Sequence, residues 1–595
     1  MPRLPDRFVY RLPVIIWSCL TAFSMPARAD EPLHQRSVVR RPVAIVSATD
    51  SRLLVANRET GTISLLNAQS APSITGEFPI ARQLDDLVAI PNASGRFLGV
   101  DSSEHQVISL TLNDRPLVTS RQTVSGDPVS LVVSADGDVV SVASLWSRRI
   151  TLLATDSLSV LTEIDIPFAP LKQVFLDDEH VLAIDAFGGR MAVIDVPHRR
   201  VQSHLSLNGQ NIRGLAVAEN RDGRRDVLLT HQILNVASST TRSIISWGGV
   251  LSNTLHSIAI DEFLESQSLD PDHPDRIHGR LFPLGTQGRG AGDPGDVTSD
   301  GESIWVALSG VNEVAVRRGS QQSLIRQQVP RRPTKLLRHG DAIAVVCTSD
   351  DSISFLDPST LETNSVLPLG PPVERTLRQS GEELFFDARL SLDGWYSCHS
   401  CHADGHTIGR LNDNFGDETF NTPKRILTLL GVGATRPWAW NGSQTNLRDQ
   451  VRKSIELTMA GPGKTAPELT PQSIEAIVAY ISALPPAPGV LAARGKTDHS
   501  RVTRGRVVFN KHGCSNCHRP PTYTSPMTHD VGIKDEWGLT AFSPPSLRGV
   551  SQRESYFHDN RARRLIDVFR EHDHDGTSSL PDQELSDLVL FLKTL

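Results

Sequence analysis

Cysteine is scarce in this chain, with six among 595 residues, and methionine is scarcer still, with five. So little cysteine excludes a small scaffold held together by disulfides. Beyond the first thirty residues, no apolar run approaches the ~20 residues of a membrane-spanning helix. The formal net charge of -7 is small for this length, which argues against a nucleic-acid partner held by a basic surface. No glycine-rich phosphate loop or serine-elbow motif stands out, which argues against a nucleotide enzyme or a hydrolase.

The amino terminus has the composition of an export signal. Three arginines precede the apolar run LPVIIWSCLTAFSM, and Ala27-Arg28-Ala29 then offers a cleavage site for signal peptidase. We therefore predict a signal peptide over residues 1–29, export to the periplasm or the cell surface, and no transmembrane segment after cleavage. An uncleaved membrane anchor is the alternative, and it is disfavoured because the run is shorter than a comfortable membrane span.

Four of the six cysteines form two close pairs, in SCHSCH (397–402) and CSNCH (514–518). A zinc ribbon places its pairs ~15–20 residues apart, and a redox dithiol needs neither the adjacent histidine nor a second copy. In C-x-x-C-H, both thiols can attach to one haem while the histidine ligates its iron. The motifs therefore predict two covalently bound haem c groups, held by Cys398, Cys401 and His402 and by Cys514, Cys517 and His518.

The sequence around these motifs repeats itself at a constant offset of 118 residues. Gly431 corresponds to Gly549, and Trp438 corresponds to Tyr556. Each copy also ends in a run whose apolar residues recur with helical spacing. The repeat predicts two mainly α-helical cytochrome c domains, over 371–487 and 497–595, joined by the segment LPPAPGVLAARG.

A second sequence repeat, with a different period, precedes the haem motifs. Seven stretches, among them SRLLVANRETGTISLLNA and DAIAVVCTSDDSISFLDPS, recur mostly every ~40–45 residues, and each reads as two short strands around a polar turn. This period predicts an all-β seven-bladed propeller over 38–367, with a long insert at about 243–298; a pair of β-sandwiches is the competing fold. Cys347 is expected to be a buried strand residue without chemistry.

The stretches LFFDARLSLDGWYSCHSCH, PWAWNGSQTNLRDQ, CSNCH and PPSLRGVSQRESYFHD together resemble the bacterial di-haem cytochrome c peroxidase family. The likeness covers about residues 371–595 and does not include the propeller. It implies two c-type haems with divided roles: one with an accessible iron reacts with hydrogen peroxide, and the other accepts electrons from a small cytochrome or copper protein. It also implies that Trp440 lies between the haems and that Gln450 lies near the reactive one.

The chain departs from the family pattern at two positions. Thr458-Met459 stand where the family has its catalytic glutamate before a methionine, which leaves Glu456 as a candidate acid or base; the alternative is a solvated helix residue. The second haem lacks the family's methionine or tyrosine ligand in DEWGLTAF. Candidates for its sixth ligand are Met527 and His574, and also His529, His558 and His572.

One further cofactor is suggested by the run DHDGTSSLPDQE, from Asp573 to Glu584. Its acidic and hydroxyl positions resemble a calcium loop, although the glycine usual at the sixth position is missing. We list calcium as a candidate on this motif alone.

These features predict an exported di-haem, peroxidase-like oxidoreductase. It would reduce hydrogen peroxide with electrons from a small cytochrome c or cupredoxin, and its propeller would serve as a binding platform. Two alternatives stay open: the haem pair oxidises a protein or organic substrate, or both irons are closed by protein ligands and the chain is a non-enzymatic electron carrier. The sequence does not identify the reactive haem.

Overall fold

The computed structural model describes residues 32–69, 71–220, 223–319, 323–415, 418–462, 469–495 and 497–595. The predicted signal peptide, residues 1–29, lies outside the described residues. No helix in the described part of the chain is long and apolar enough to cross a membrane.

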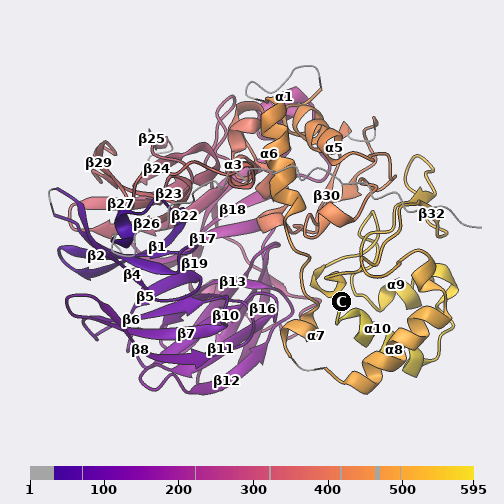
Figure 1. Cartoon of the computed structure of the whole chain (residues 1–595), viewed down its shortest axis with the longest axis horizontal. Coiled ribbons are helices and arrows are strands. Elements are labelled where there is room, and N and C mark those ends of the chain that lie inside the picture. The colour runs from indigo at the N-terminus through magenta and orange to yellow at the C-terminus, as the bar shows by residue number, and fades with distance from the viewer. Residues whose placement is uncertain are drawn as a thin grey trace, which may run out of the picture.

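The chain first forms seven consecutive antiparallel sheets, the blades of a propeller (Figure 1). Blade 1 contains β1 (Pro42–Thr49), β2 (Arg52–Asn57), β3 (Thr62–Asn67) and β4 (Ser73–Pro79). Blade 2 contains β5 (Leu84–Ala89), β6 (Arg96–Asp101), β7 (Gln106–Leu112) and β8 (Pro116–Thr123). Blade 3 contains β9 (Pro128–Val133), β10 (Val139–Ser144), β11 (Arg149–Ala154) and β12 (Val160–Asp165). Blade 4 contains β13 (Pro170–Phe175), β14 (His180–Asp185), β15 (Arg190–Asp195) and β16 (Arg200–Ser206).

The remaining three blades follow the same order. Blade 5 contains β17 (Gln210–Glu219), β18 (Arg225–Leu234), β19 (Leu251–Ala259) and β21 (Arg280–Pro283). Blade 6 contains β22 (Pro294–Ser299), β23 (Ser303–Leu308), β24 (Glu313–Arg318) and β25 (Ile325–Gln328). Blade 7 contains β26 (Pro333–His339), β27 (Ala342–Cys347), β28 (Ser352–Leu356) and β29 (Thr363–Pro368). The predicted seven-bladed propeller is confirmed, and Cys347 is a buried strand residue as expected.

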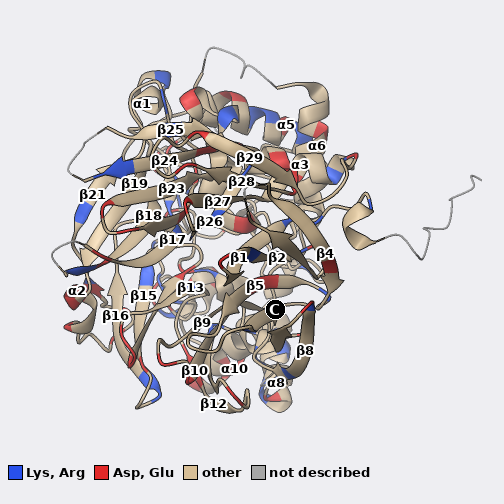
Figure 2. Cartoon of the chain, turned by 90° about the vertical axis from the view of Figure 1, so that its left-hand side faces the viewer, with Lys and Arg blue, Asp and Glu red and all other residues tan. Residues whose placement is uncertain are grey.

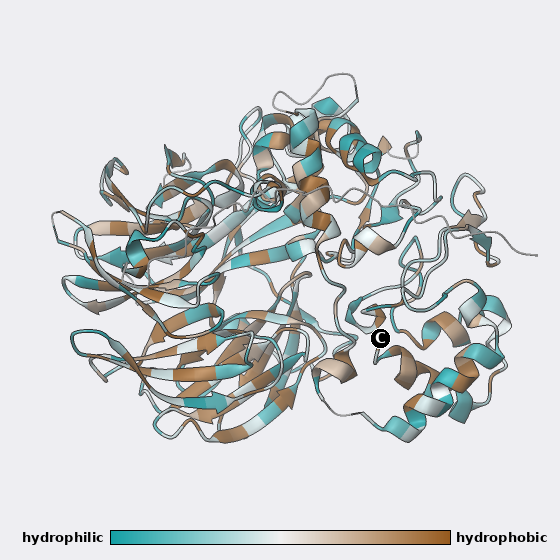
Figure 3. Cartoon of the chain, in the orientation of Figure 1, coloured by the Kyte–Doolittle hydropathy of each residue, from teal (hydrophilic) through white to brown (hydrophobic). Residues whose placement is uncertain are grey.

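Packing between neighbouring blades explains why their inner strands are apolar on both faces. In β2, the consecutive residues Leu53, Leu54 and Val55 are all buried. Leu54 belongs to a core shared with blade 2, whereas Leu53 and Val55 belong to a core shared with blade 7. Blade 1 therefore packs against the last blade and closes the ring, which removes long exposed sheet edges. Figure 3 shows hydrophobic stretches along the blade strands.

The prediction of one long insert over about 243–298 needs correction. This stretch contains β19, β21 and most of β22, which are regular blade strands, and β20 (Asp275–Arg276), which pairs in parallel with β16 of blade 4. The non-strand parts carry the short helices α1 (Arg242–Ser246) and α2 (Asp261–Leu264). The sequence of β19, LSNTLHSIA, hides its strand character because Ser, Asn, Thr and His interrupt the apolar pattern.

A mainly helical region follows the propeller. Its first half contains α3 (Leu377–Phe385), α4 (Cys398–Cys401), α5 (Leu447–Lys453), a π-helical turn (Ser454–Met459) and α6 (Pro471–Ser482). Its second half contains α7 (Val490–Ala493), α8 (His499–Lys511), α9 (Asp567–Arg570) and α10 (Asp582–Leu592). The short strand pairs β30 (Leu411–Asn412) with β31 (Lys424–Arg425) and β32 (His529–Asp530) with β33 (Ala541–Phe542) complete the two halves.

The two halves repeat the same local geometry. Isolated bridges join Trp438 to Gln444 and Tyr556 to Ala562, at the offset of 118 residues seen in the sequence. In each half, a glycine lets the first long helix approach the last one. A Cβ at Gly381 of α3 would lie 1.8 Å from a carbonyl oxygen of α6, and one at Gly505 of α8 would lie 2.0 Å from a carbonyl oxygen of α10.

The helical region lies against one side of the propeller and bonds to it directly (Figure 1). Asn253 of β19 donates to the backbone carbonyl of Trp395 at 2.8 Å, and Arg148 donates to Gln552 Oε1 at 2.9 Å. The opposite side of the propeller carries charges of both signs, scattered over its strands and loops (Figure 2). The propeller therefore contacts both halves of the helical region.

Candidate haem sites

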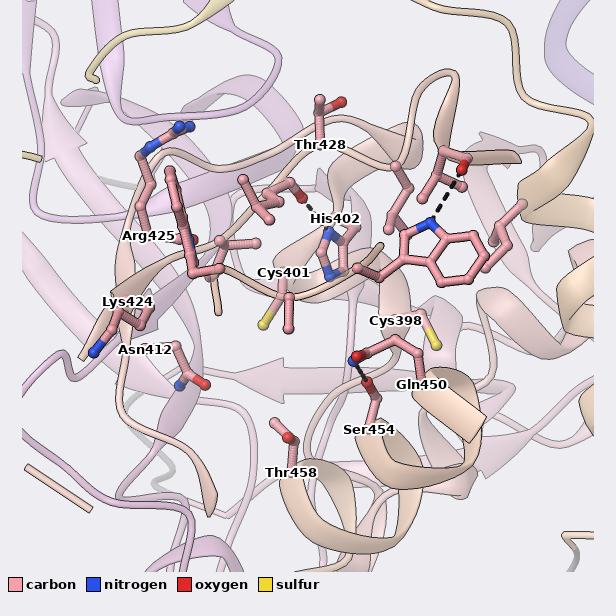
Figure 4. A pocket seen from close by; sticks show the side chains of 18 of the residues that line it. Cys398, Cys401, His402, Asn412, Lys424, Arg425, Thr428, Gln450, Ser454 and Thr458 are labelled. Atoms are coloured by element: carbon pink, nitrogen blue, oxygen red, sulfur yellow. Dashed lines mark hydrogen bonds between the residues drawn. The ribbon is translucent and has the colours of Figure 1, made fainter. Parts of the chain in front are cut away.

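The first motif occupies the one-turn helix α4, which Ser397 caps by accepting the N–H of His399 at 3.0 Å. Cys398, Cys401 and His402 lie on the wall of a cavity of about 330 Å³ (Figure 4). The rest of this wall is largely apolar and includes Phe385, Ile426, Leu429, Val432, Trp438, Leu447, Val451, Ile455, Ile477 and Ile481. An apolar cavity with a few placed polar groups is the usual form of a cofactor site.

His402 is held in the state that a metal ligand requires. Its Nδ1 lies 2.9 Å from the backbone carbonyl of Leu427. Because a carbonyl only accepts, Nδ1 carries the proton, and Nε2 is left with a free lone pair. Burial lowers the pKa of His402 to about 4, so the ring is neutral at physiological pH. A neutral imidazole with a free Nε2 is the form that binds iron.

The wall across from His402 comes from α5 and the π-helical turn. Gln450, Ser454 and Thr458 lie there, and Gln450 Nε2 donates to Ser454 Oγ at 3.1 Å (Figure 4). Met459 also lines the cavity, whereas Glu456, on the same turn, does not. None of the described residues on this wall is Asp or Glu. π-Helical turns inside α-helices are often found at functional sites.

The second motif repeats this arrangement around a smaller cavity. Cys514, Cys517 and His518 line a cavity of about 140 Å³. His518 Nδ1 lies 3.2 Å from the carbonyl of Tyr523, and burial lowers the pKa of His518 to about 4. His574 lies on the same wall, with its ring centre 6.4 Å from that of His518. Its Nδ1 is buried and has no hydrogen-bond partner.

The other candidates for the sixth ligand occupy different environments. Met527 is 62% exposed and does not line the second cavity. His529 lines it, and its Nε2 lies 2.9 Å from Ser525 Oγ. His558 is buried and stacks on Phe542, outside the cavity wall. His572 has Nε2 3.2 Å from the carbonyl of Arg561.

Trp440 lies between the two cavities and lines both of them. Its Nε1 donates to the carbonyl of Arg425 at 2.8 Å, which fixes the indole. Arg425 and Arg553 also line both cavities, and among the described residues they donate to the backbone carbonyls of Phe557 and Ser546 and form no ion pair with a carboxylate. Burial lowers the pKa of Arg425 to about 9 and that of Arg553 to about 10. Buried cations without a counter-ion are costly, so an anionic group is expected beside them.

These observations fit two haem groups attached through the two motifs. Each cavity offers two thiols, a neutral imidazole with a free Nε2 and apolar walls, and the shared arginines fit the propionate carboxylates of a haem. No disulfide engages the cysteines of the described residues. Arg425 and Arg553 were missed in the sequence, because arginine is usually exposed and no motif marks a buried one.

The suggested calcium loop does not form a metal site in the part of the chain that the structure describes. Glu584, its last acidic position, pairs with Lys511 at 3.0 Å instead of turning toward Asp573. Within the described ranges, no group of three or more His, Cys, Asp or Glu side chains could hold a metal ion. The described residues of this loop therefore provide no calcium site.

Known proteins match the region that contains these cavities. Residues 376–488 match the model of the family described as di-haem cytochrome c peroxidase. The gamma subunit of hydrazine synthase from Kuenenia stuttgartiensis is 28% identical, over 38% of this chain and 79% of that protein. The methylamine utilization protein MauG of Methylorubrum extorquens is 25% identical, over 43% of this chain and 88% of that protein.

A solved structure covers a larger part of the chain. A chain of Kuenenia stuttgartiensis hydrazine synthase matches 55% of this chain and 98% of its own length, with 16% identity and a TM-score of 0.45. The paired cavities, their repeated C-x-x-C-H motifs and the family match all fall after the propeller. The region that follows the seven-bladed propeller is thus similar to the di-haem cytochrome c peroxidase family, whose model matches residues 376–488 of it.

Proposed function

We propose that this chain is an exported di-haem oxidoreductase in which the first cavity reacts with hydrogen peroxide and the second receives electrons from a small redox protein. The contrast between the two cavities supports this proposal. The polar side chains across from His402 are those of Gln450, Ser454 and Thr458, which are weak iron ligands, and Met459 offers a thioether on the same cavity wall; an imidazole lies close to His518. When bound, a haem with a free iron position supplies chemistry with small molecules, and one closed by two protein ligands supplies electron transfer.

His574 is the proposed sixth ligand in the second cavity. Together with His518 it would hold the iron of the second haem, and a metal takes imidazole nitrogens at about 2.0 Å. The separation of 6.4 Å between His518 and His574 agrees with this arrangement. Met527 is not assigned this role, because its side chain is largely exposed and lies outside the cavity wall.

Hydroxyl groups of this chain hold protons at the first cavity. Ser454 Oγ accepts from Gln450, so its own proton is free to be donated to a small molecule in the cavity. Reduction of hydrogen peroxide to two water molecules takes up two electrons and two protons. Ser454 and Thr458 are therefore proposed to donate hydrogen bonds to a small molecule in the cavity, with the two protons coming from solvent, while Trp440 lies on the way between the cavities.

Glu456 is the proposed acid or base of the first cavity. Its carboxyl group does not line the cavity, so it would act through Ser454 or Thr458, which share its helical turn. If Glu456 takes part, Glu456→Gln lowers the rate of peroxide reduction and shifts its pH profile. If it is a solvated helix residue, both stay at the wild-type values.

The electron donor is proposed to be a small cytochrome c or cupredoxin in the same exported compartment. The family resemblance supports a donor of this kind, and the signal-like amino terminus supports export. The propeller is proposed as a binding platform because it contacts the first haem motif and has a large exposed face (Figure 2).

A second candidate function is supported by the composition of the first cavity. Because none of its described wall residues is a carboxylate, the group that assists cleavage of peroxide in the family has no direct equivalent here. This favours either a different substrate, such as an organic molecule or a protein, or electron transfer without catalysis.

Steady-state turnover distinguishes these functions. Holoprotein is mixed with reduced small cytochrome c and hydrogen peroxide, and oxidation of the cytochrome is followed. The proposal predicts two cytochromes oxidised per peroxide consumed, and loss of this turnover in the double variant Cys514→Ala/Cys517→Ala. A rate no higher than that without the protein would reject the peroxidase function and leave the second candidate.

A further inference from the structure

A propeller carboxylate is bonded directly to the first haem motif. Asp293 lies just before β22, is almost completely buried, and accepts hydrogen bonds from the hydroxyls of Ser397 and Ser400. Ser400 lies between Cys398 and Cys401, and Ser397 immediately precedes them and lines the first cavity. The carboxylate is therefore one hydrogen bond away from the cavity wall.

The hydrogen-bond directions show which form of Asp293 is present. Ser400 Oγ accepts the N–H of Ser397 at 2.9 Å and Gln232 Nε2–H at 3.2 Å, so its own proton is donated to Asp293, at 2.5 Å. Ser397 Oγ accepts from His399 and donates its proton to the other carboxylate oxygen. Burial raises the pKa of Asp293, and the serine donors oppose this rise. A group that only accepts hydrogen bonds is favoured as the anion.

Residues of blade 5 extend this contact into the propeller. Gln232 of β18 donates to Asp293 at 3.2 Å and to Asn253 at 2.8 Å, and Asn211 of β17 donates to Gln232 at 2.9 Å. All of these side chains are buried. A satisfied buried network of this kind holds its members in one arrangement.

A second contact from the same blade reaches the residues just after His402. Arg213 of β17 pairs with Asp404 at 2.7 Å, and its Nε donates to Asn211 at 2.5 Å. The propeller thus contacts the motif before its first cysteine, between its cysteines and after its histidine. Asp293 brings a buried negative charge to the motif, and Arg213 brings a positive charge.

We propose that Asp293 is a positioning residue of the first haem site and that its negative charge lowers the reduction potential of that haem. The inference rests on the proposed haem attachment at Cys398, Cys401 and His402. A nearby negative charge stabilises the ferric form relative to the ferrous form, and it acts strongly where water is excluded. The positive charge of Arg213 acts in the opposite direction and raises the reduction potential of the same haem. The propeller is therefore part of the first haem site and sets its electron affinity.

Spectroelectrochemical titration of the full-length holoprotein tests the inference, with the first haem assigned by its absence from Cys398→Ala/Cys401→Ala. Asp293→Asn keeps the size of the side chain and removes its charge, so the midpoint of the first haem should rise while the second stays unchanged. Asp293→Glu should bring the midpoint back toward the wild-type value. Arg213→Gln should shift the same midpoint in the opposite direction, downward.

The matched control is Asp101→Asn, which removes another buried propeller carboxylate, at the end of β6, that accepts backbone N–H groups of its own blade. This variant should leave the midpoint potentials of both haems unchanged. Equal shifts in both haems, no shift in Asp293→Asn, or the same shift in Asp101→Asn would overturn the inference. If Asp293→Asn does not fold, Asp293→Ser is measured in its place, because it removes the same charge and keeps a hydrogen-bonding group for Ser397 and Ser400; it should raise the same midpoint.

Haem counting separates this inference from the proposed function. Pyridine haemochrome analysis of the wild type should give two haems per chain. Fewer haems would reject the haem assignment itself, whereas two haems without the predicted shifts would reject only the role of Asp293.

Discussion

At the scale of single residues, the tautomers of His402 and His518 support their proposed role as iron ligands. His402 and His518 both place Nδ1 against a backbone carbonyl, which leaves Nε2 for iron and fixes the plane of each ring. Between the two sites, Trp440 is the one indole that lines both cavities among the described residues. Its position suggests that electrons pass between the haems at this ring.

Replacing Trp440 tests this electron path. Trp440→Phe removes the larger ring and its bond to Arg425, and we expect electron transfer between the haems to slow roughly tenfold, about 1.4 kcal/mol of barrier. Stopped-flow spectroscopy of half-reduced protein measures this rate. The control is Trp438→Phe, which changes an indole that lines only the first cavity. Equal rates in wild type and Trp440→Phe would rule out the relay.

His406 predicts how stability depends on pH. It is packed against Phe187 of the propeller, and burial lowers its pKa to about 3. An unfolded histidine protonates near pH 6.5, so below that pH the unfolded state binds more protons and the free energy of unfolding falls as the pH falls. His406→Gln should lose about 2 kcal/mol less than wild type between pH 6.5 and pH 5. Denaturant titrations at both pH values measure this, and identical losses would contradict it.

Residues differ in how far the sequence alone could reveal them. The haem-motif residues could be predicted because covalent attachment and ligation require fixed local spacing, and the structure places all six on cavity walls. Asp293, Arg425 and Arg553 could not be predicted. Their burial and their neighbours arise from contacts between segments far apart in the chain, which leave no local pattern.

At the scale of elements, the close approach of two helix pairs supports both cavities. α3 packs on α6 at Gly381, and α8 packs on α10 at Gly505, with no room for a side chain at either glycine. The helical spacing of α6 and α10 could be predicted from their sequences, as could the blade strands. β19 could not be predicted, because its polar residues have buried partners that the local sequence does not show, as Asn253 has in the carbonyl of Trp395 of the helical region.

Substitution of the second helix glycine tests this packing. Gly505→Ala places a Cβ 2.0 Å from the carbonyl of Asp587, so α8 must move away from α10. We expect a loss of about 1–3 kcal/mol in stability, the usual cost of overpacking. Thermal unfolding of the holoprotein, followed at the haem absorbance, measures the loss. Val507→Ala, at an exposed position of the same helix, should cost less than about 0.5 kcal/mol. A stable Gly505→Ala would contradict the contact.

At the scale of the whole molecule, the propeller and the haem region share buried bonds. Asp293 and Arg213 reach the first motif, and Arg148 reaches Gln552, which follows the second motif in sequence. The sequence could predict both folds but not this contact surface. Each repeat pattern reflects packing within its own domain and carries no information on which residues contact the other domain. Blade 1 shares cores with blades 2 and 7, whereas blades 4 and 5 also share a core with the helical region. We predict that the propeller folds without haem.

Removal of one attachment motif tests that independence. Cys398→Ala/Cys401→Ala should lower the covalent haem content from two to one per chain and leave the β-sheet circular dichroism of the propeller unchanged. Cys514→Ala/Cys517→Ala is the matched variant and should also retain one haem. Two haems in either variant would refute the motif assignment.

We propose that the first haem has a free iron position and that the iron of the second haem is closed by two histidines. Low-temperature EPR of the holoprotein, oxidised and then reduced by one electron, with and without hydrogen peroxide, tests it most directly. We predict one high-spin signal that responds to peroxide and disappears in Cys398→Ala/Cys401→Ala, and one low-spin signal that changes in His574→Ala. Two low-spin irons that ignore peroxide in both states would contradict it and would identify the chain as an electron carrier.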